Sequence, residues 1–257
     1  MSNRSPSLSN IPIDPGELAL LETAAKQAHM SLGDFIRHTA IQAAETELLE
    51  RRRVTVPTEN WDRIEAWIDA PPKDIPALLL STTIQPAGSI RLLTPDDDRY
   101  AFDCKRESLN RWFWHHAWRD HETGMARIHV AIDPTSGDII GFVSLSLAEI
   151  RRTPEPSYGA SSDISLTTLP AVLLSRIAVD QRYQRLGHAR SLLRFALAST
   201  VRVTRDIGGF CALTHPLDDQ VRTFFRTLGF EAIPGDPAGG MAIRVIDLEH
   251  NTELPRA

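Results

Sequence analysis

The spacing of apolar residues changes near residue 88. Before that point it predicts two helices: Asp14-Pro15 starts the first, which runs to about Ala28, and Ser31 caps the second, which continues to the basic triplet 51–53. A short extended stretch, residues 8–13, precedes them. One strand and two helices cannot bury a core alone, so we expect this part of the chain to dimerise through the strand.

Residues 54–88 combine large apolar side chains with prolines. Trp61, Ile64 and Trp67 share a short predicted helix, which Pro71 and Pro72 end. So many apolar side chains on so small a scaffold need a partner surface. We therefore predict that this segment, the arm, docks on another domain; the alternative is a linker that packs on its own domain.

From Ser89 to the C-terminus, predicted strands and helices alternate. This pattern predicts a mixed α/β (α+β) domain, residues 89–257, around one central sheet. The predicted strands are 89–95, 126–133, 138–150, 171–180, 209–216 and 240–248, and the predicted helices are 102–121, 190–206 and 218–229.

Composition and charge exclude several classes of protein. Hydrophobic content of 42% and charged content of 24% are ordinary for a globular protein, and the net charge of -5 gives no overall attraction to nucleic acid. Cys104 and Cys211 lack the spacing of a metal or redox motif, so we expect no metal site and a reducing compartment. Neither a signal peptide nor an apolar run of membrane-spanning length is present, which predicts a cytoplasmic protein without membrane contact.

The run RIAVDQRYQRLGHARSLL, residues 176–193, carries the clearest chemical signal. A buried strand ends at Val179-Asp180, and a loop containing Gly187 leads directly into a helix. Unpaired N–H groups and the positive end of the helix dipole then meet at one place, which suits a pyrophosphate. Arg185 and Arg190 add positive charge there.

In this motif, Gln184, Gly187 and Ala189 match the Q/R-x-x-G-x-G/A signature, and residues 91–248 resemble the GCN5-related N-acetyltransferase (GNAT) family. The resemblance implies that acetyl-CoA is the co-substrate. It narrows to the toxin branch (TacT type), which acetylates the amino group of aminoacyl-tRNA and so blocks translation. The cofactor-binding positions that it implies are Ile177, Ala178, Val179, Gln184, Arg185, Leu186, Gly187, His188, Ala189 and Arg190.

The first 88 residues resemble the ribbon-helix-helix antitoxins (TacA type) that accompany such toxins, through Asp14-Pro15, residues 30–36, Trp61 and Pro71-Pro72. The chain thus resembles a fusion of antitoxin and toxin: a dimerisation and DNA-binding domain, residues 1–53, the docking arm, residues 54–88, and the GNAT domain. The resemblance implies a homodimer or higher even oligomer that represses transcription at an operator. Arg4, Asn10 and Ser31 are the candidate DNA contacts, although Pro12 stands where the family usually has a polar residue.

Two residues near the C-terminus bear on catalysis. The resemblance implies that Phe225 stands where the toxins carry a tyrosine that protonates the departing thiolate, and phenylalanine has no proton to give. His215, at the end of a predicted strand, is a second candidate. The alternative function is a catalytically impaired GNAT domain that binds ligand or aids assembly in a transcriptional regulator; a small-molecule or protein N-acetyltransferase is a third. Arginines that outnumber aspartates between Arg182 and Arg226 predict a surface for tRNA phosphates.

Overall fold

The computed structural model describes residues 11–79, 89–153 and 167–251. It separates the chain into two compact units, Met1–Glu45 and Thr46–Ala257. Among the described residues, no helix is both long and apolar enough to cross a membrane. Most of the predicted ribbon, including Arg4 and Asn10, lies outside the described residues.

The first unit contains one helix and the first part of a second, and both helices begin where the sequence predicts. Helix α1 (Pro15–Gln27) begins at Asp14, whose carboxylate accepts hydrogen bonds from the N–H groups of Gly16 and Glu17. Helix α2 (Leu32–Glu50) begins after Ser31, whose hydroxyl accepts the N–H of Asp34 at 3.1 Å. Ser31, a candidate DNA contact, is therefore committed to capping this helix.

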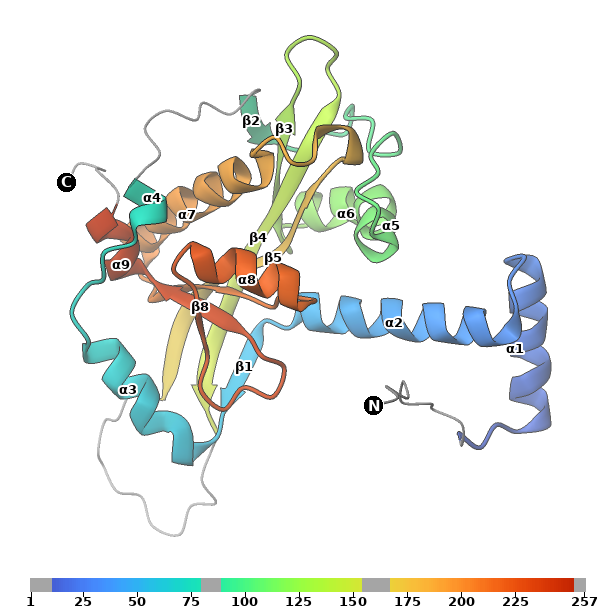
Figure 1. Cartoon of the computed structure of the whole chain (residues 1–257), viewed down its shortest axis with the longest axis horizontal. Coiled ribbons are helices and arrows are strands. Elements are labelled where there is room, and N and C mark those ends of the chain that lie inside the picture. Colours follow the sequence, from blue (N-terminus) through green and yellow to red (C-terminus); the bar gives the residue numbers. More distant parts are fainter. Residues whose placement is uncertain (1–10, 80–88, 154–166, 252–257) are drawn as a thin grey trace, which may run out of the picture. The chain divides into compact units, whose positions relative to one another are not determined.

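The described part of the second unit contains one mixed sheet, as the sequence predicts (Figure 1). The sheet has eight strands, of which two, residues 53–56 and 231–232, are not among the predicted ones. Its strands run in the order β2-β3-β4-β5-β6-β8-β7, and β1 pairs with β4. Neighbours are antiparallel except β1 with β4 and β5 with β6, which are parallel. The strands are β1 (Arg53–Val56), β2 (Ser89–Leu92), β3 (Arg127–Ile132), β4 (Ile139–Arg152), β5 (Thr168–Val179), β6 (Cys211–Thr214), β7 (Glu231–Ala232) and β8 (Met241–Arg244).

Helices cover both faces of this sheet. Because consecutive strand residues point to opposite faces, Phe142 of β4 packs with α5 (Glu107–His115) and α6 (Ala117–Glu122), whereas Val143 packs with α7 (His188–Ile207) and α8 (Asp219–Thr227). Phe113 stacks on Phe142 with ring centroids 4.2 Å apart. The aromatic run around Phe113 therefore builds a core, and the predicted helix over 102–121 is in fact two helices.

The arm adds a strand and a helix to the second unit. Strand β1 extends the sheet along the second half of β4, and α3 (Trp61–Asp69) buries Trp61 and Ile64 against β5 and β6. A 3-10 turn, Thr58–Asn60, precedes α3, and the short helix α4 (Pro76–Leu79) follows it. The prediction that these apolar side chains need a partner surface is consistent with this packing, in which a strand of the arm joins the sheet.

The predicted strand over 240–248 is wrong in its second half. Strand β8 ends at Arg244 and the chain turns into α9 (Val245–Asn251). The side chain of Arg244, fully buried, donates to both carboxylate oxygens of Asp247 and to the carbonyls of Trp67, Ile68, Ala70 and Pro71. This guanidinium binds the C-terminal end of α3, so it holds the arm on the sheet.

His129 of β3 makes stability depend on pH. It packs against Phe195 of α7, and burial lowers the pKa of His129 to about 4. The unfolded chain, with a histidine pKa of about 6.5, binds the proton first, so the free energy of unfolding falls as the pH drops from about 6.5 to 4. We expect His129→Leu to flatten this part of the stability curve, measured by urea unfolding. Parallel stability curves for the variant and the wild type across that range would contradict the assignment. Above pH 7.5 the histidine is neutral in the folded and the unfolded chain, so the difference between the two proteins should no longer change with pH there, which serves as the control.

Candidate active site

The sheet opens between β5 and β6. Their pairing ends at Leu174 opposite Thr214, while β5 continues to Val179. A register shift between β4 and β5 leaves Ser175 as an extra residue at the point where the opening begins. Beyond it, the backbone groups of β5 that face β6 have no strand partner among the described residues, and they can bind a ligand that enters the opening.

The loop after β5 has the geometry of an anion site. Gly187 has φ +90°, and a side chain at this position would be strained although the space around it is empty. No side chain in the described part of the chain caps α7, so the positive end of its dipole faces this loop. Arg185 also adopts a positive φ, 66°. The loop that the sequence singled out therefore presents an uncapped helix N-terminus.

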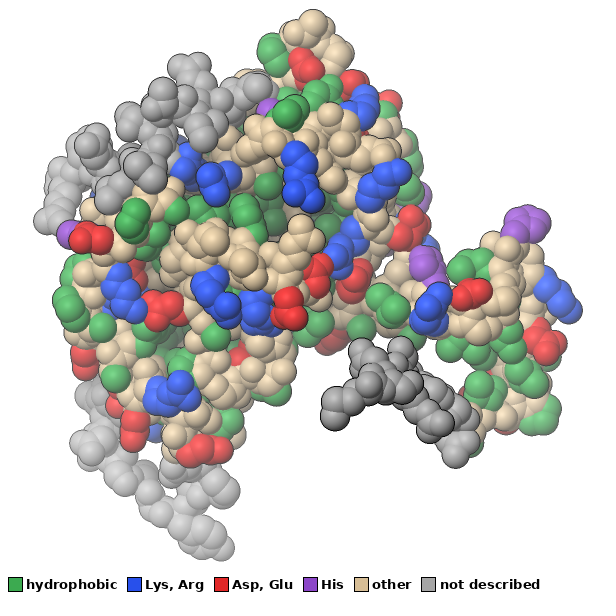
Figure 2. Space-filling model, in the orientation of Figure 1, with side chains coloured by type: hydrophobic (Ala, Val, Ile, Leu, Met, Phe, Trp, Pro, Cys, Tyr) green, Lys and Arg blue, Asp and Glu red, His purple; other side chains and the backbone are tan. Residues whose placement is uncertain are grey.

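A cavity of about 690 Å³ joins this loop to the open part of β5. Figure 2 shows a hollow between α7 and α8 with hydrophobic side chains inside it and basic ones on its margins. Nine of the ten predicted cofactor-binding residues line the cavity: Ile177, Ala178, Val179, Gln184, Arg185, Gly187, His188, Ala189 and Arg190. Leu186 does not; its side chain is exposed.

Gln184 braces the loop in this structure. Its side-chain amide donates to the backbone carbonyls of Cys104 and Val179, at 3.2 and 3.0 Å. These bonds tie the segment before α5 to the end of β5, and so fix the width of the cavity. His188, the first residue of α7, is buried, and burial lowers the pKa of its imidazole, which is therefore neutral at pH 7.

The opposite wall contains residues that the sequence analysis missed. Arg106 and Asp218 form an ion pair, and both line the cavity, as does Cys104. Burial raises the pKa of the Cys104 thiol to about 11, which keeps it protonated. Asp218 has a sequence signal, because an aspartate before a helix caps it, and it does accept the N–H of Val221 at 2.8 Å.

The two adjacent phenylalanines of α8 differ in their surroundings. Phe224 lines the cavity. Phe225 is 2% exposed and packs edge-on against Phe230, with ring centroids 5.1 Å apart. Its assignment as the position of the acid tyrosine stays a prediction.

His215 lies just beyond the last paired residue of β6 and does not line the cavity. It is buried, its Nε2 is 3.0 Å from the carbonyl oxygen of Arg51, and burial lowers its pKa. Its Nδ1 has no partner among the described residues. These contacts support a structural role, at the place where the chain enters β1.

The described residues contain no group of three His, Cys, Asp or Glu side chains that could hold a metal ion. The sheet opening and the uncapped helix N-terminus define the class: the second unit has the GNAT fold. In keeping with this, the solved structure of a mutant of the toxin AtaT, in which one tyrosine is replaced by phenylalanine, matches with a TM-score of 0.58 and 25% identity over 66% of this chain and 98% of that one.

Comparison with known proteins is more specific still. The family model "Antitoxin TacA 1-like" matches residues 10–83. A tRNA-acetylating toxin of Mycobacterium tuberculosis is 31% identical over 147 residues, 57% of this chain and 86% of that protein. Antitoxin TacA1 of Salmonella typhimurium is 36% identical over 69 residues, 27% of this chain and 73% of that protein. The chain belongs to the tRNA-acetylating GNAT toxins and, through its N-terminal part, to the TacA-type antitoxins; it joins the two in one polypeptide.

Two further solved structures carry ligands. AtaTR bound with acetyl-CoA matches with a TM-score of 0.58 and 25% identity over 63% of this chain and 96% of that one. AtaT complexed with acetyl-methionyl-tRNAfMet matches with a TM-score of 0.56 and 25% identity over 63% of this chain and 97% of that one. Acetyl-CoA and the acetylated tRNA are the ligands of these related proteins.

Proposed function

We propose that the chain binds acetyl-CoA in the 690 Å³ cavity and transfers the acetyl group to the amino group of aminoacyl-tRNA, and that its antitoxin part restrains this activity. The observation that carries the proposal is the left-handed Gly187 beside the uncapped start of α7, directly after the open end of β5. The acetyl-CoA complex of AtaTR and the acetylated tRNA complex of AtaT support the choice of substrates.

In this proposal the first turn of α7, with Arg185 and Arg190, binds the pyrophosphate. Backbone groups of Ile177, Ala178 and Val179 position the pantetheine and the thioester carbonyl. Acetyl transfer to an aligned amine needs mainly positioning and a hydrogen-bond donor for the developing oxyanion, each of which contributes several kcal/mol. Phe225 supplies no proton, so a thiol with an ordinary pKa of about 8.5 must leave without a general acid.

We assign one role to each of three segments: dimerisation and DNA binding to residues 1–53, docking to the arm, residues 54–88, and acetyl transfer to residues 89–257. Exposed apolar side chains on α1 and α2, such as Leu20 and Ile41, which are 70% and 52% exposed, support dimerisation through the first segment, and this dimer would bind operator DNA. The arm, fused to its target, stays at a local concentration on the order of mM. The fused chain therefore rests in a restrained state.

The absence of a hydroxyl group on Phe225 favours a second candidate function. With Phe225 instead of tyrosine, the GNAT domain could bind acetyl-CoA without turning it over and serve a transcriptional regulator as a ligand-binding module. Transfer of labelled acetyl from acetyl-CoA to a mixture of charged tRNAs by the full chain separates the two. Label that is recovered on the aminoacyl group supports the acetyltransferase, whereas acetyl-CoA binding without any transfer supports the regulator.

Gly187→Val tests the cavity itself. Valine is strained at φ +90° and its β-branch crowds the N–H groups of the first turn of α7, so we expect acetyl-CoA to bind about tenfold or more weakly in calorimetry. Gly137→Val is the matched control, because Gly137 also has a positive φ, 78°, with empty space around it but lies in the turn between β3 and β4. Equal affinity of the two variants would count against the cavity as the acetyl-CoA site.

A further inference from the structure

A second cavity, of about 280 Å³, lies on the other face of β5. It is lined in part by Arg176, which directly precedes Ile177 of the first cavity. Arg176 lies over Trp112 of α5, and α6 contributes Asp120 to the second cavity, whereas α7 and α8 line the first, so the two cavities approach the same stretch of β5 from different sides. The remaining lining residues come from the end of α2, from α6 and the turn after it, and from β4 and β5.

The second cavity contains buried polar groups that lack partners. Arg176 is 4% exposed, and its Nε has no hydrogen-bond partner among the described residues. The hydroxyl of Ser144, fully buried, also has none. Arg176 lies over the ring of Trp112 at 4.2 Å, which fixes the plane of its guanidinium. A buried guanidinium stays charged and is costly without an anion, so this cavity requires one.

The anion present is the carboxylate of Glu50, the last residue of α2. Its Oε1 accepts from Arg176 Nη2 at 2.8 Å, while its side chain is 53% exposed. The residue after it also reaches the sheet: Arg51 donates to the buried carboxylate of Asp236, and its carbonyl oxygen contacts His215. The junction, residues 50–53, thus touches both strands that border the opening, β5 at Arg176 and β6 beyond Thr214.

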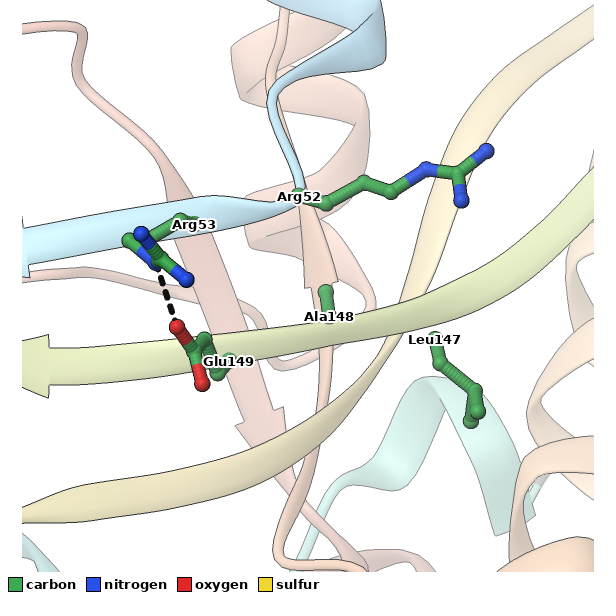
Figure 3. Close-up of a pocket in the computed structure, with 5 residues that line it drawn as sticks. All are labelled: Arg52, Arg53, Leu147, Ala148 and Glu149. Atoms are coloured by element: carbon green, nitrogen blue, oxygen red, sulfur yellow. Dashed lines mark hydrogen bonds and ion pairs between the residues drawn. The ribbon is translucent and has the colours of Figure 1, made fainter. Parts of the chain in front are cut away.

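Figure 3 shows how the rest of the junction is held. Arg53 pairs with Glu149 of β4, and the Arg52 side chain extends away from that pair. Arg52 donates to the carbonyl of Met125 at 2.9 Å and lines the second cavity. Its guanidinium adds a second positive charge near Arg176.

We infer that the second cavity binds the 3′ end of the acceptor RNA and that Arg176 pairs there with a backbone phosphate. In the fused chain without RNA, the carboxylate of Glu50 occupies the position of this phosphate. The inference rests on the proposed function and specifies its regulation. The planar fork of an arginine matches phosphate as well as carboxylate. Asp120, which lines the same cavity and accepts from Trp112 Nε1 at 3.1 Å, supplies a carboxylate that accepts a hydrogen bond from the substrate's neutral amine; when this amine attacks the thioester, the C–S bond breaks and the proton that the nitrogen loses goes to the departing thiolate.

In this arrangement the junction hinders binding of the acceptor RNA and does not hinder binding of acetyl-CoA. No described residue of the junction or the arm lines the first cavity. The second cavity is lined by Glu50 and Arg52. Because the Glu50 carboxylate is half exposed, it can leave Arg176 when a phosphate competes for the guanidinium. The junction therefore acts as a competitive inhibitor of RNA binding.

The test measures RNA binding by the full chain. The probe is a fluorescent RNA hairpin ending in CCA, with an amino acid joined to its 3′ end through a stable amide so that the amine stays free. We expect Glu50→Ala to tighten binding about tenfold, because the phosphate no longer displaces a carboxylate. Glu149→Ala is the matched control: it removes the same charge and breaks another ion pair of the junction, and we expect it to leave the affinity nearly unchanged.

Further variants assign the effect to Arg176. In the Glu50→Ala background, Arg176→Gln should abolish the gain, and Arg176→Lys should restore part of it; melting curves confirm that each variant is folded. Equal affinities of Glu50→Ala and Glu149→Ala would overturn the inference, as would a gain that survives Arg176→Gln. Calorimetry with acetyl-CoA on the same proteins reports the proposed function separately: tighter RNA binding without acetyl-CoA binding keeps the inference and rejects the acetyltransferase.

Discussion

Arg244→Met will lower the free energy of unfolding of the second unit by about 3–5 kcal/mol, the usual cost of removing one partner of a buried ion pair. Methionine fills much of the same space but donates no hydrogen bond. Asp247 then stays buried without its cation, and the carbonyls at the end of α3 lose their donor. Urea unfolding measures the loss, and hydrogen exchange should show reduced protection in α3.

The control for this prediction is Arg53→Ala. Arg53, directly before the arm, also forms an ion pair with the sheet, through Glu149 of β4, but its side chain is 64% exposed. Exposed ion pairs contribute about 0–1 kcal/mol, so the control should remain close to wild type. If Arg244→Met cost no more than Arg53→Ala, Arg244 would not be what holds the end of α3.

Phe225→Tyr will raise the single-turnover rate of acetyl transfer to aminoacyl-tRNA about 10²-fold or more, the low end of what a general acid contributes. The reason is the proton that tyrosine can give to the departing thiolate. The measurement is a rapid-quench assay with acetyl-CoA and one charged tRNA, made on Phe225→Tyr in the Glu50→Ala background to relieve the restraint.

Phe224→Tyr is the neighbouring control. Phe224 lines the first cavity and Phe225 packs behind it in the core, so a hydroxyl at each position tests which ring reaches the reacting sulfur. A larger gain from Phe224→Tyr, or no gain from either, would contradict the assignment of the acid position to Phe225.

Local sequence patterns predict most of the elements of this fold correctly. Asp14 and Ser31 cap their helices through short-range hydrogen bonds, and the alternation of apolar strands and amphipathic helices after Ser89 indicates a mixed sheet because it reflects burial directly. The Gly187 loop was predicted for the same reason: a glycine between a strand and a helix acts within a few residues. These features depend on near neighbours in the chain.

Long-range contacts could not be predicted in this way. RVID, residues 244–247, continues an apolar run and was assigned to a strand, but Arg244 and Asp247 pair three residues apart on a helical turn and meet α3, far away in sequence. Glu50 and Arg176 are likewise distant in sequence: Arg176 begins the run 176–193, but no local pattern in that run indicates a contact with Glu50. Such contacts follow from the tertiary arrangement, which places the junction beside the open end of the sheet.

The measurement that tests the central claim most directly is calorimetry of acetyl-CoA binding to the full chain and to Glu50→Ala. The account holds that the antitoxin part leaves the first cavity open and occupies the acceptor side. It predicts one acetyl-CoA per chain with the same affinity in both proteins. Absence of binding to the full chain, or binding that appears only after Glu50 is replaced, would contradict it.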